Sequence, residues 1–354
     1  MTDNAIYPWL QDNWQRLIQR YQRDQLPHAL LLSGPVGLGK QYFAEQLART
    51  LMCDRNHKTA NSGDLSPPCG ECNGCHLMKA GTHPDYRVVQ PESEGKQIPI
   101  DSIREVSQFL NLKSQFAPMQ VIIVTPAEAM NRYAANSLLK TLEEPTPGSL
   151  LLLISSQMSH LLPTIRSRCQ VVNFTAPATA QARQWLDSQL DESMASLSGE
   201  DKERLLVLAQ GSPLTALKFA QTGMLEQYQR LLQSFEKIAK KQVDPVAEAK
   251  QWEAVGLSQA VTWLYGWVAA LIRFKSDPGT VDSTGVGTGE STMQWREPAL
   301  ASLQHQLQLQ QLYRYLDKVV ATVRIKDTTV NVQLALEDLL ISWQQLHAGY
   351  ANPQ

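Results

Sequence analysis

A glycine-rich loop set between an apolar run and an amphipathic segment is the feature that most constrains how this chain can fold. Residues 34–40 read GPVGLGK and match the pattern G-x-x-x-x-G-K. The loop follows the apolar run at residues 28–32, and it precedes a segment in which Phe43, Leu47 and Leu51 recur every four residues. This order predicts a buried strand, a phosphate-binding loop and a helix, which together are typical of an α/β fold.

The chemistry of this loop suits the phosphates of a nucleotide. The backbone N–H groups of a glycine-rich turn point inward around a phosphate, and the N-terminus of the following helix adds a partial positive charge. A lysine at the end of the motif supplies a full charge to the β- and γ-phosphates. We therefore take four residues as candidates for binding ATP or ADP: Gly34, Gly37, Gly39 and Lys40.

The residues that usually hold Mg²⁺ and activate water are missing from their expected positions. Gln41 follows the lysine, where a hydroxyl side chain normally binds the metal ion. After the apolar run at residues 121–124, Thr125 and Pro126 stand where an aspartate and a glutamate are expected, and Glu128 comes later. The sequence predicts a loop with no Mg²⁺ site, which holds a nucleotide without hydrolysing it. The alternative is a loop that is only structural.

Strand and helix patterns alternate over the first half of the chain. Apolar or β-branched runs at residues 88–89, 121–124 and 150–154 predict further strands. Apolar spacing over residues 103–110 and 134–144 predicts helices between them. Strands that alternate with helices in this way favour a parallel sheet with helices on both faces.

Beyond residue 174 the strand patterns nearly disappear, and helical spacing continues toward the end of the chain. The sequence GSP at residues 211–213 predicts a sharp break between two helices. Residues 276–292 contain several glycines and few apolar side chains, so we predict a disordered loop there; the alternative is a linker between domains. An all-α region therefore follows the α/β core.

The charge balance and the lack of a long apolar run exclude some classes of protein. Lys and Arg number 32 against 34 Asp and Glu, a net charge of −2, which excludes a nucleic-acid binder that depends on bulk positive charge. The sequence has no run of about 18 apolar residues, and its N-terminal stretch lacks the pattern of a secretory signal. We expect an intracellular protein, in which a reducing environment disfavours disulfides.

Four of the five cysteines are spaced so that they could hold one metal ion. They are Cys53, Cys69, Cys72 and Cys75. Four thiolates satisfy the tetrahedral preference of a structural Zn²⁺, which would fold the polar segment at residues 54–68, predicted as a loop with little core of its own. The alternatives are an iron–sulfur cluster, cysteines without a metal, or one histidine, His57 or His76, in place of a thiolate.

Residues 165–169 (IRSRC) carry two arginines beside a serine, just before the short β-like run at residues 170–172. Taken alone, this element is an ordinary solvated turn. Cys169 is then a small buried residue without chemistry.

Several stretches together resemble one family. They are residues 28–40, the cysteine insertion, AGTHPDY at 80–86, NSLLKTLEEPTPGSLLLLISS at 136–156, and LLPTIRSRCQ at 161–170. In these stretches the chain resembles the clamp-loader branch of the AAA+ ATPases. The cysteine insertion narrows the resemblance to the bacterial DNA polymerase III clamp loaders.

The resemblance implies both a fold and an assembly. The fold would be an AAA+ core over residues 1–174 with a zinc-binding insertion around 53–75, a small helical lid over 175–222, and a helical collar over 223–354 that oligomerises. The assembly would be a ring with gamma/tau-like motor subunits and a delta-like subunit, which uses ATP to open the sliding clamp and place it on primed DNA. It would work in the bacterial cytoplasm, at the nucleoid during replication, and without contact to a membrane.

The missing metal residues then imply a stator that does not turn over ATP itself. The resemblance assigns Arg168 as an arginine finger acting in trans on ATP held by a neighbour, with Arg166 the weaker candidate. Leu214 stands where active relatives carry a sensor arginine, and Ser155 or Ser156 resembles a polar sensor position. The rival hypotheses are a self-sufficient AAA+ ATPase that remodels nucleic acids and a zinc-dependent nucleic-acid module.

Overall fold

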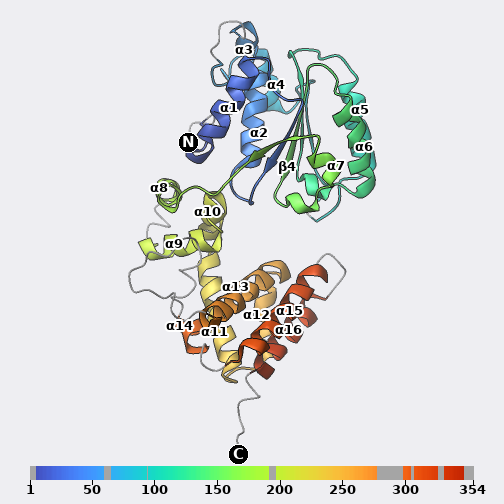
Figure 1. The fold of residues 1–354 in the computed structure, drawn as a ribbon. Coiled ribbons are helices and arrows are strands. Elements are labelled where there is room, and N and C mark those ends of the chain that lie inside the picture. Colours follow the sequence, from blue (N-terminus) through green and yellow to red (C-terminus); the bar gives the residue numbers. More distant parts are fainter. Residues whose placement is uncertain are drawn as a thin grey trace, which may run out of the picture. The chain divides into compact units, whose positions relative to one another are not determined.

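The computed structural model describes residues 5–59, 65–93, 95–190, 197–276, 298–303, 307–325 and 331–346 (Figure 1). The chain divides into two compact units. The first comprises Met1–Trp185 with Ser212–Thr215, and the second comprises Leu186–Gly211 with Ala216–Gln354. Apart from its first residue, the loop predicted at residues 276–292 lies outside the described residues. The division into core, lid and collar stays a prediction.

A five-stranded parallel sheet forms the centre of the first unit, in the order β2-β3-β4-β1-β5. The strands are β1 (Ala29–Ser33), β2 (Tyr86–Val89), β3 (Gln120–Val124), β4 (Ser149–Ser155) and β5 (Gln170–Asn173). Every residue of β1 and β3 is buried, as expected of strands that are covered on both faces and have continuous apolar sequences. The predicted parallel α/β core is confirmed.

Helices cover both faces of this sheet (Figure 1). One apolar cluster joins the sheet to α5 and α6, and another joins it to α1 and α2. The helices of this unit are η1 (Pro8–Leu10), α1 (Gln11–Gln22), α2 (Lys40–Leu51), α3 (Asp54–Thr59), α4 (Asn73–Ala80), α5 (Ile100–Leu110), η2 (Ala127–Ala129), α6 (Arg132–Glu143), η3 (Met158–His160) and α7 (Pro163–Arg166). The order of strands and helices along the chain agrees with the alternation in the sequence.

Part of the polar segment that the sequence predicts as a loop is helical. α3 occupies Asp54–Thr59, and its sequence DRNHKT offers no apolar spacing that could have indicated a helix. Polar contacts fix this region instead. The side-chain amide of the buried Asn56 donates to the carbonyl oxygens of Thr50 and Ser66, at 2.9 Å in each case.

A buried carboxylate fastens the loop that leads into β3. Asp85, in the AGTHPDY segment, is 1% exposed. Its two carboxylate oxygens accept hydrogen bonds from the backbone N–H groups of three consecutive residues, Gln115, Phe116 and Ala117, at 2.8, 2.7 and 2.9 Å. Charge-assisted bonds of this kind hold a turn that has few apolar contacts of its own.

The second unit is helical throughout its described residues, as predicted. Its helices are α9 (Gly199–Leu208), α11 (Met224–Ala239), α12 (Pro245–Glu253), α13 (Leu257–Ser276), α14 (Pro298–Leu303), α15 (Leu309–Ile325) and α16 (Val332–Leu346); α8 (Thr179–Gln189) and α10 (Pro213–Gln221) cross between the units. Aromatic side chains dominate its core. The ring of the fully buried Trp343 stacks on Phe235 at 4.0 Å, and its Nε1 donates to the Phe235 carbonyl oxygen at 3.0 Å.

Among the described helices, none is by itself long and apolar enough to cross a membrane. The consecutive helices α12 and α13 reach the required length and apolar character only as a pair, with a bend of 120° between them.

Candidate functional site

The glycine-rich loop lies between β1 and α2, and its shape requires all three of its glycines. Gly37 and Gly39 have φ angles of +79° and +85°, in the left-handed region that side chains disfavour. A Cβ atom on Gly34 would lie 2.1 Å from the Phe174 carbonyl oxygen, and one on Gly37 would lie 1.9 Å from Thr215 Oγ1. The structure thus gives the loop the compact backbone path of a phosphate-binding turn.

Lys40, the first residue of α2, is turned back onto its own loop. Its Nζ donates to the carbonyl oxygens of Gly34 and Pro35, each at 2.6 Å. The side chain is buried, and burial lowers the pKa of Lys40 to about 8, although the nearby Glu128 carboxylate opposes this shift. The ammonium group that would meet a phosphate is therefore bonded inside the protein.

Glu128 comes after the positions where the acids are expected, and it lies in the short helix η2 at the carboxyl edge of the sheet. Its Oε1 accepts hydrogen bonds from the backbone N–H (2.9 Å) and the hydroxyl (2.6 Å) of Ser156, which follows β4. Burial disfavours ionisation, but these hydrogen bonds outweigh it and lower the pKa of the Glu128 carboxyl.

The other oxygen of this carboxylate, Oε2, is buried without a hydrogen-bond partner in the described part of the chain. A signal for this arrangement was present in the sequence, because the carboxyl ends of neighbouring parallel strands meet at one edge. Because Glu128 follows β3 and Ser156 follows β4, their proximity could have been predicted from the sequence.

Gln41 and Thr125, at positions where metal ligands are expected, make contacts elsewhere. The side-chain amide of Gln41 donates along its own helix to Glu45 at 3.0 Å. Thr125 is buried, and its backbone N–H donates to the Val89 carbonyl oxygen of the neighbouring strand at 2.9 Å. Glu128 is thus the one acid among these positions, and it is close enough to Lys40 to influence the pKa of that lysine.

Residues at the start of α10 and near the N-terminus cover the loop, and no pattern in the sequence indicates these contacts. The Leu214 N–H donates to the Gly37 carbonyl oxygen at 3.2 Å, and the Thr215 hydroxyl donates to the Val36 carbonyl oxygen at 3.4 Å. On the other side, Trp9 Nε1 donates to the Leu38 carbonyl oxygen at 3.0 Å. The loop is therefore held by direct hydrogen bonds to its backbone.

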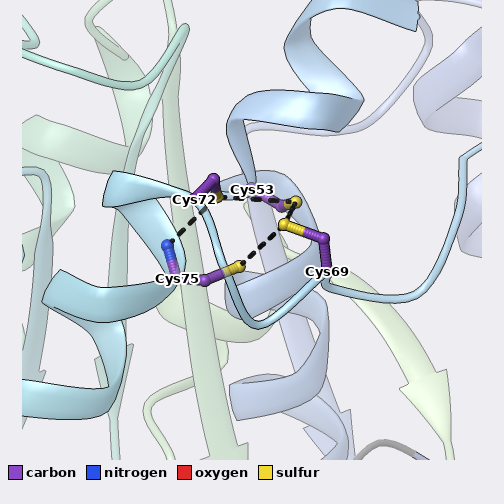
Figure 2. Close-up of side chains that lie close together, drawn as sticks. All are labelled: Cys53, Cys69, Cys72 and Cys75. Atoms are coloured by element: carbon purple, nitrogen blue, oxygen red, sulfur yellow. Dashed lines mark hydrogen bonds between the residues drawn. The ribbon is translucent and has the colours of Figure 1, made fainter.

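The four cysteines predicted as metal ligands come together (Figure 2). Cys53 follows the end of α2, Cys69 and Cys72 precede α4, and Cys75 lies in its first turn. All four sulfur atoms lie within 4.8 Å of one another, and three pairs are separated by 3.7–3.9 Å: Cys53–Cys69, Cys69–Cys75 and Cys53–Cys72.

The spacing of the sulfur atoms favours a single Zn²⁺ over an iron–sulfur cluster. Ligands at about 2.3 Å from a tetrahedral Zn²⁺ lie about 3.8 Å apart, which matches the observed sulfur separations. An iron–sulfur cluster would place several atoms between the thiolates and spread them further. The candidate group contains no histidine: His76 is exposed, and the His57 side chain lies outside the part that the structure describes.

Arg168 follows α7, and its guanidinium is held by three contacts. Nη2 pairs with Oε1 of Glu143 at 2.6 Å, and Nη1 donates to the Thr164 carbonyl oxygen at 3.1 Å and to the Ser167 hydroxyl at 3.4 Å. The side chain remains 36% exposed. Arg166 differs, because its Nε is buried and has no hydrogen-bond partner within the described ranges.

Arg168 and the glycine-rich loop lie at opposite ends of the same strands. β5 begins at Gln170, which is opposite Leu30 of β1, so Arg168 lies near the level of His28. The loop begins at Gly34, past the other end of β1. Six residues of strand at ~3.3 Å each place about 20 Å between the two levels. Arg168 therefore cannot reach a phosphate held by the loop of its own chain.

Cys169 does not take part in either site. It is buried in the apolar cluster beneath α6, and burial raises the pKa of its thiol to about 12. It anchors the arginine-bearing turn to the core and is chemically inert.

Known proteins match this chain over both units. The family model described as "DNA polymerase III, delta subunit" matches residues 9–178, and the model described as "DNA polymerase III, delta subunit, C terminal" matches residues 222–345. A DNA polymerase III subunit delta′ from Pseudomonas aeruginosa is 37% identical over 348 residues, which cover 96% of this chain and 98% of that protein. The delta′ subunit from Haemophilus influenzae is 33% identical over 85% of this chain and 88% of its own length. A gamma subunit-related protein from Thermotoga maritima has a crystal structure that matches 95% of this chain and 99% of its own, with 20% identity and a TM-score of 0.44.

Proposed function

Because this chain belongs to the family of DNA polymerase III delta′ subunits, we propose that it is a clamp-loader subunit that does not hydrolyse ATP and supplies Arg168 to a neighbour. The neighbour is a gamma/tau-like motor subunit, and a delta-like subunit completes the ring. The complex opens the sliding clamp and places it on primed DNA in the cytoplasm, at the nucleoid.

The observation that carries this proposal is the place of Arg168. The side chain is ordered by Glu143 and Thr164, it keeps an exposed guanidinium, and it lies about 20 Å along the strands from the loop of its own chain. A guanidinium fork neutralises charge that develops on a γ-phosphate during transfer. Here that charge belongs to ATP bound by another subunit.

The contacts of the loop support the lack of hydrolysis. Lys40 is bonded to two carbonyl groups of its own loop, and Gln41 turns away along α2. Phosphoryl transfer depends on a metal ion and on charges positioned around the phosphate. A chain whose hydroxyl ligand is missing lacks part of that positioning. ATP or ADP can bind only after Lys40 leaves the carbonyl groups of Gly34 and Pro35.

A second function, a self-sufficient AAA+ ATPase, is favoured by one observation. The buried, unpartnered Oε2 of Glu128 lies near Lys40 and could hold a Mg²⁺ ion together with nucleotide phosphates. Against it stands the absence of a hydroxyl at Gln41, and Ser156 already engages the other carboxylate oxygen. We therefore rank this function second.

We assign a structural role to the four-cysteine site. The donor set and the sulfur spacing fit Zn²⁺, and the four thiolates Cys53, Cys69, Cys72 and Cys75 would fill its tetrahedral shell. Such an ion would supply folding energy and would leave no open position for catalysis.

Two measurements test the proposed function. The purified chain is assayed for Mg²⁺-dependent ATP turnover, and the reconstituted clamp loader is assayed with Arg168→Ala against the matched control Arg166→Ala. We expect no turnover by the chain alone and slower turnover by the ring with Arg168→Ala. Turnover by the chain alone that disappears with Glu128→Gln would establish the second function instead. A ring that is unaffected by Arg168→Ala would refute the finger assignment.

A further inference from the structure

One of the three contacts of Arg168 comes from a distant part of the chain. Thr164 and Ser167 belong to the same turn as the arginine. Glu143 lies 25 positions earlier, as the last residue of α6, and it makes the shortest of the three contacts, with 2.6 Å between Oε1 and Nη2. The side chain of Glu143 is half exposed.

The stability of α6 does not explain an acid at this position. The last carbonyl groups of a helix carry a partial negative charge, so a carboxylate there is unfavourable. The favourable partner of Glu143 is therefore the arginine and not its own helix. The next residue, Glu144, is exposed, and within the described residues its side chain makes no hydrogen bond or ion pair. Substitution of Glu144 therefore serves as a control, because it removes the same negative charge without removing a contact to Arg168.

The geometry leaves Arg168 able to bind a phosphate while Glu143 holds it. A guanidinium has five N–H donors in a planar fork. The contacts to Glu143, Thr164 and Ser167 engage Nη1 and one side of Nη2. The Nε–H and the second Nη2 hydrogen remain for an incoming phosphate oxygen.

We infer that Glu143 is a positioning residue for the arginine finger, an inference that rests on the proposed function of Arg168. A free arginine loses much rotamer freedom when it is fixed on a phosphate, and this loss adds to the barrier of the reaction. Glu143 orders the side chain before the neighbour's ATP arrives. Its contribution is made in the transition state, so it raises kcat and leaves KM for ATP unchanged.

The test uses the reconstituted clamp loader with clamp and primed DNA. Its steady-state ATPase is measured with Glu143→Gln, Glu144→Gln, Arg168→Ala and the double variant Glu143→Gln/Arg168→Ala. An exposed ion pair corresponds to roughly a two- to five-fold effect on a rate. At the ATP site that receives Arg168, we expect Glu143→Gln to lower kcat by roughly that factor, with KM unchanged. Arg168→Ala should lower kcat further.

The double variant distinguishes a positioning role of Glu143 from a merely structural one. If Glu143 acts through the arginine, adding Glu143→Gln to Arg168→Ala has no further effect. Glu144→Gln should behave as the unmodified ring, and thermal unfolding should show that every variant is folded.

The outcomes separate this inference from the proposed function. Normal turnover with Glu143→Gln, beside reduced turnover with Arg168→Ala, would overturn the inference and leave the finger in place. An equal loss from Glu143→Gln in the presence and absence of Arg168 would also overturn it, because the acid would then act by another route. Normal turnover with Arg168→Ala would overturn the proposed function itself.

Discussion

If the four-cysteine site holds Zn²⁺, as we propose, loss of the ion should unfold one short segment and leave the sheet intact. α4 has only eight residues, below the length at which an isolated helix is stable in water. Its buried side chains are Cys75 and Met78. Burial of an apolar side chain of this size contributes about 1.5–3 kcal/mol, which is little to order eight residues.

Binding of a structural Zn²⁺ contributes far more, about 10–16 kcal/mol in small zinc domains. If its loss removes even ~3 kcal/mol from the local opening free energy, amide exchange speeds up by roughly 100-fold. We therefore expect Cys72→Ser to abolish zinc binding and to accelerate exchange in residues 69–80 by at least about that factor. Exchange in β1 and β3 should not change. Hydrogen exchange with mass spectrometry, together with metal analysis, measures both effects.

The matched control is Cys169→Ala, which removes a buried thiol outside the cluster and should leave the zinc content unchanged. A Cys72→Ser protein that has lost its zinc but keeps slow exchange in α4 would refute the reasoning. The fold of this segment would then depend on its protein contacts and not on a metal.

Three further predictions concern stability, and denaturant titrations measure each of them. Burial lowers the pKa of Lys40 to about 8, so between about pH 8 and the ordinary lysine value of 10.5 the unfolded chain binds more protons than the folded one. The free energy of unfolding of the unmodified protein, minus that of Lys40→Met, should therefore rise from pH 7.5 to pH 10. A difference that stays constant or falls over this range would contradict the prediction. Asp85→Ala leaves three backbone N–H groups without their acceptor and should lower the free energy of unfolding by about 3–6 kcal/mol. Asp85→Asn should lower it less. A loss below ~1 kcal/mol for the alanine variant would contradict this prediction. Trp343→Ala empties a fully buried site against Phe235 and should cost about 3–5 kcal/mol in the unfolding of the second unit, with the exposed Tyr313→Ala as a control that changes little.

Elements with a clear local sequence pattern could be predicted from the sequence alone. The run from β1 through the loop to α2 has strand, turn and helix signals in succession, and the structure has them in that order. The four cysteines could be proposed as one group because their close spacing matches the ligand set of a structural Zn²⁺. The helix α3 was missed because its polar residues carry no periodic signal.

The contacts that give the candidate sites their detail are non-local, and they depend on which strands and helices lie side by side. Glu128 reaches Ser156 only because β3 and β4 are neighbours in the sheet. The hydroxyl of Thr215 bonds to the carbonyl group of Val36, which is 179 positions away in the chain. The pairing of Glu143 with Arg168 likewise depends on how α6 and α7 pack. Such contacts follow from tertiary structure; Glu128 and Ser156 could be paired because each follows one of two neighbouring parallel strands, but no pattern in the sequence indicates the other two contacts.

The opposite placement of Arg168 and the glycine-rich loop gives this molecule a polarity. One end of its sheet can donate a positive charge, and the other end has the shape to receive a phosphate. If subunits with this layout pass an arginine from one to the next, they meet through unlike surfaces, and such a head-to-tail interface gives a ring when its rotation closes. Under the proposed function, this chain donates Arg168 to one neighbour and hydrolyses no ATP itself, so it would end the series of ATP sites around the ring.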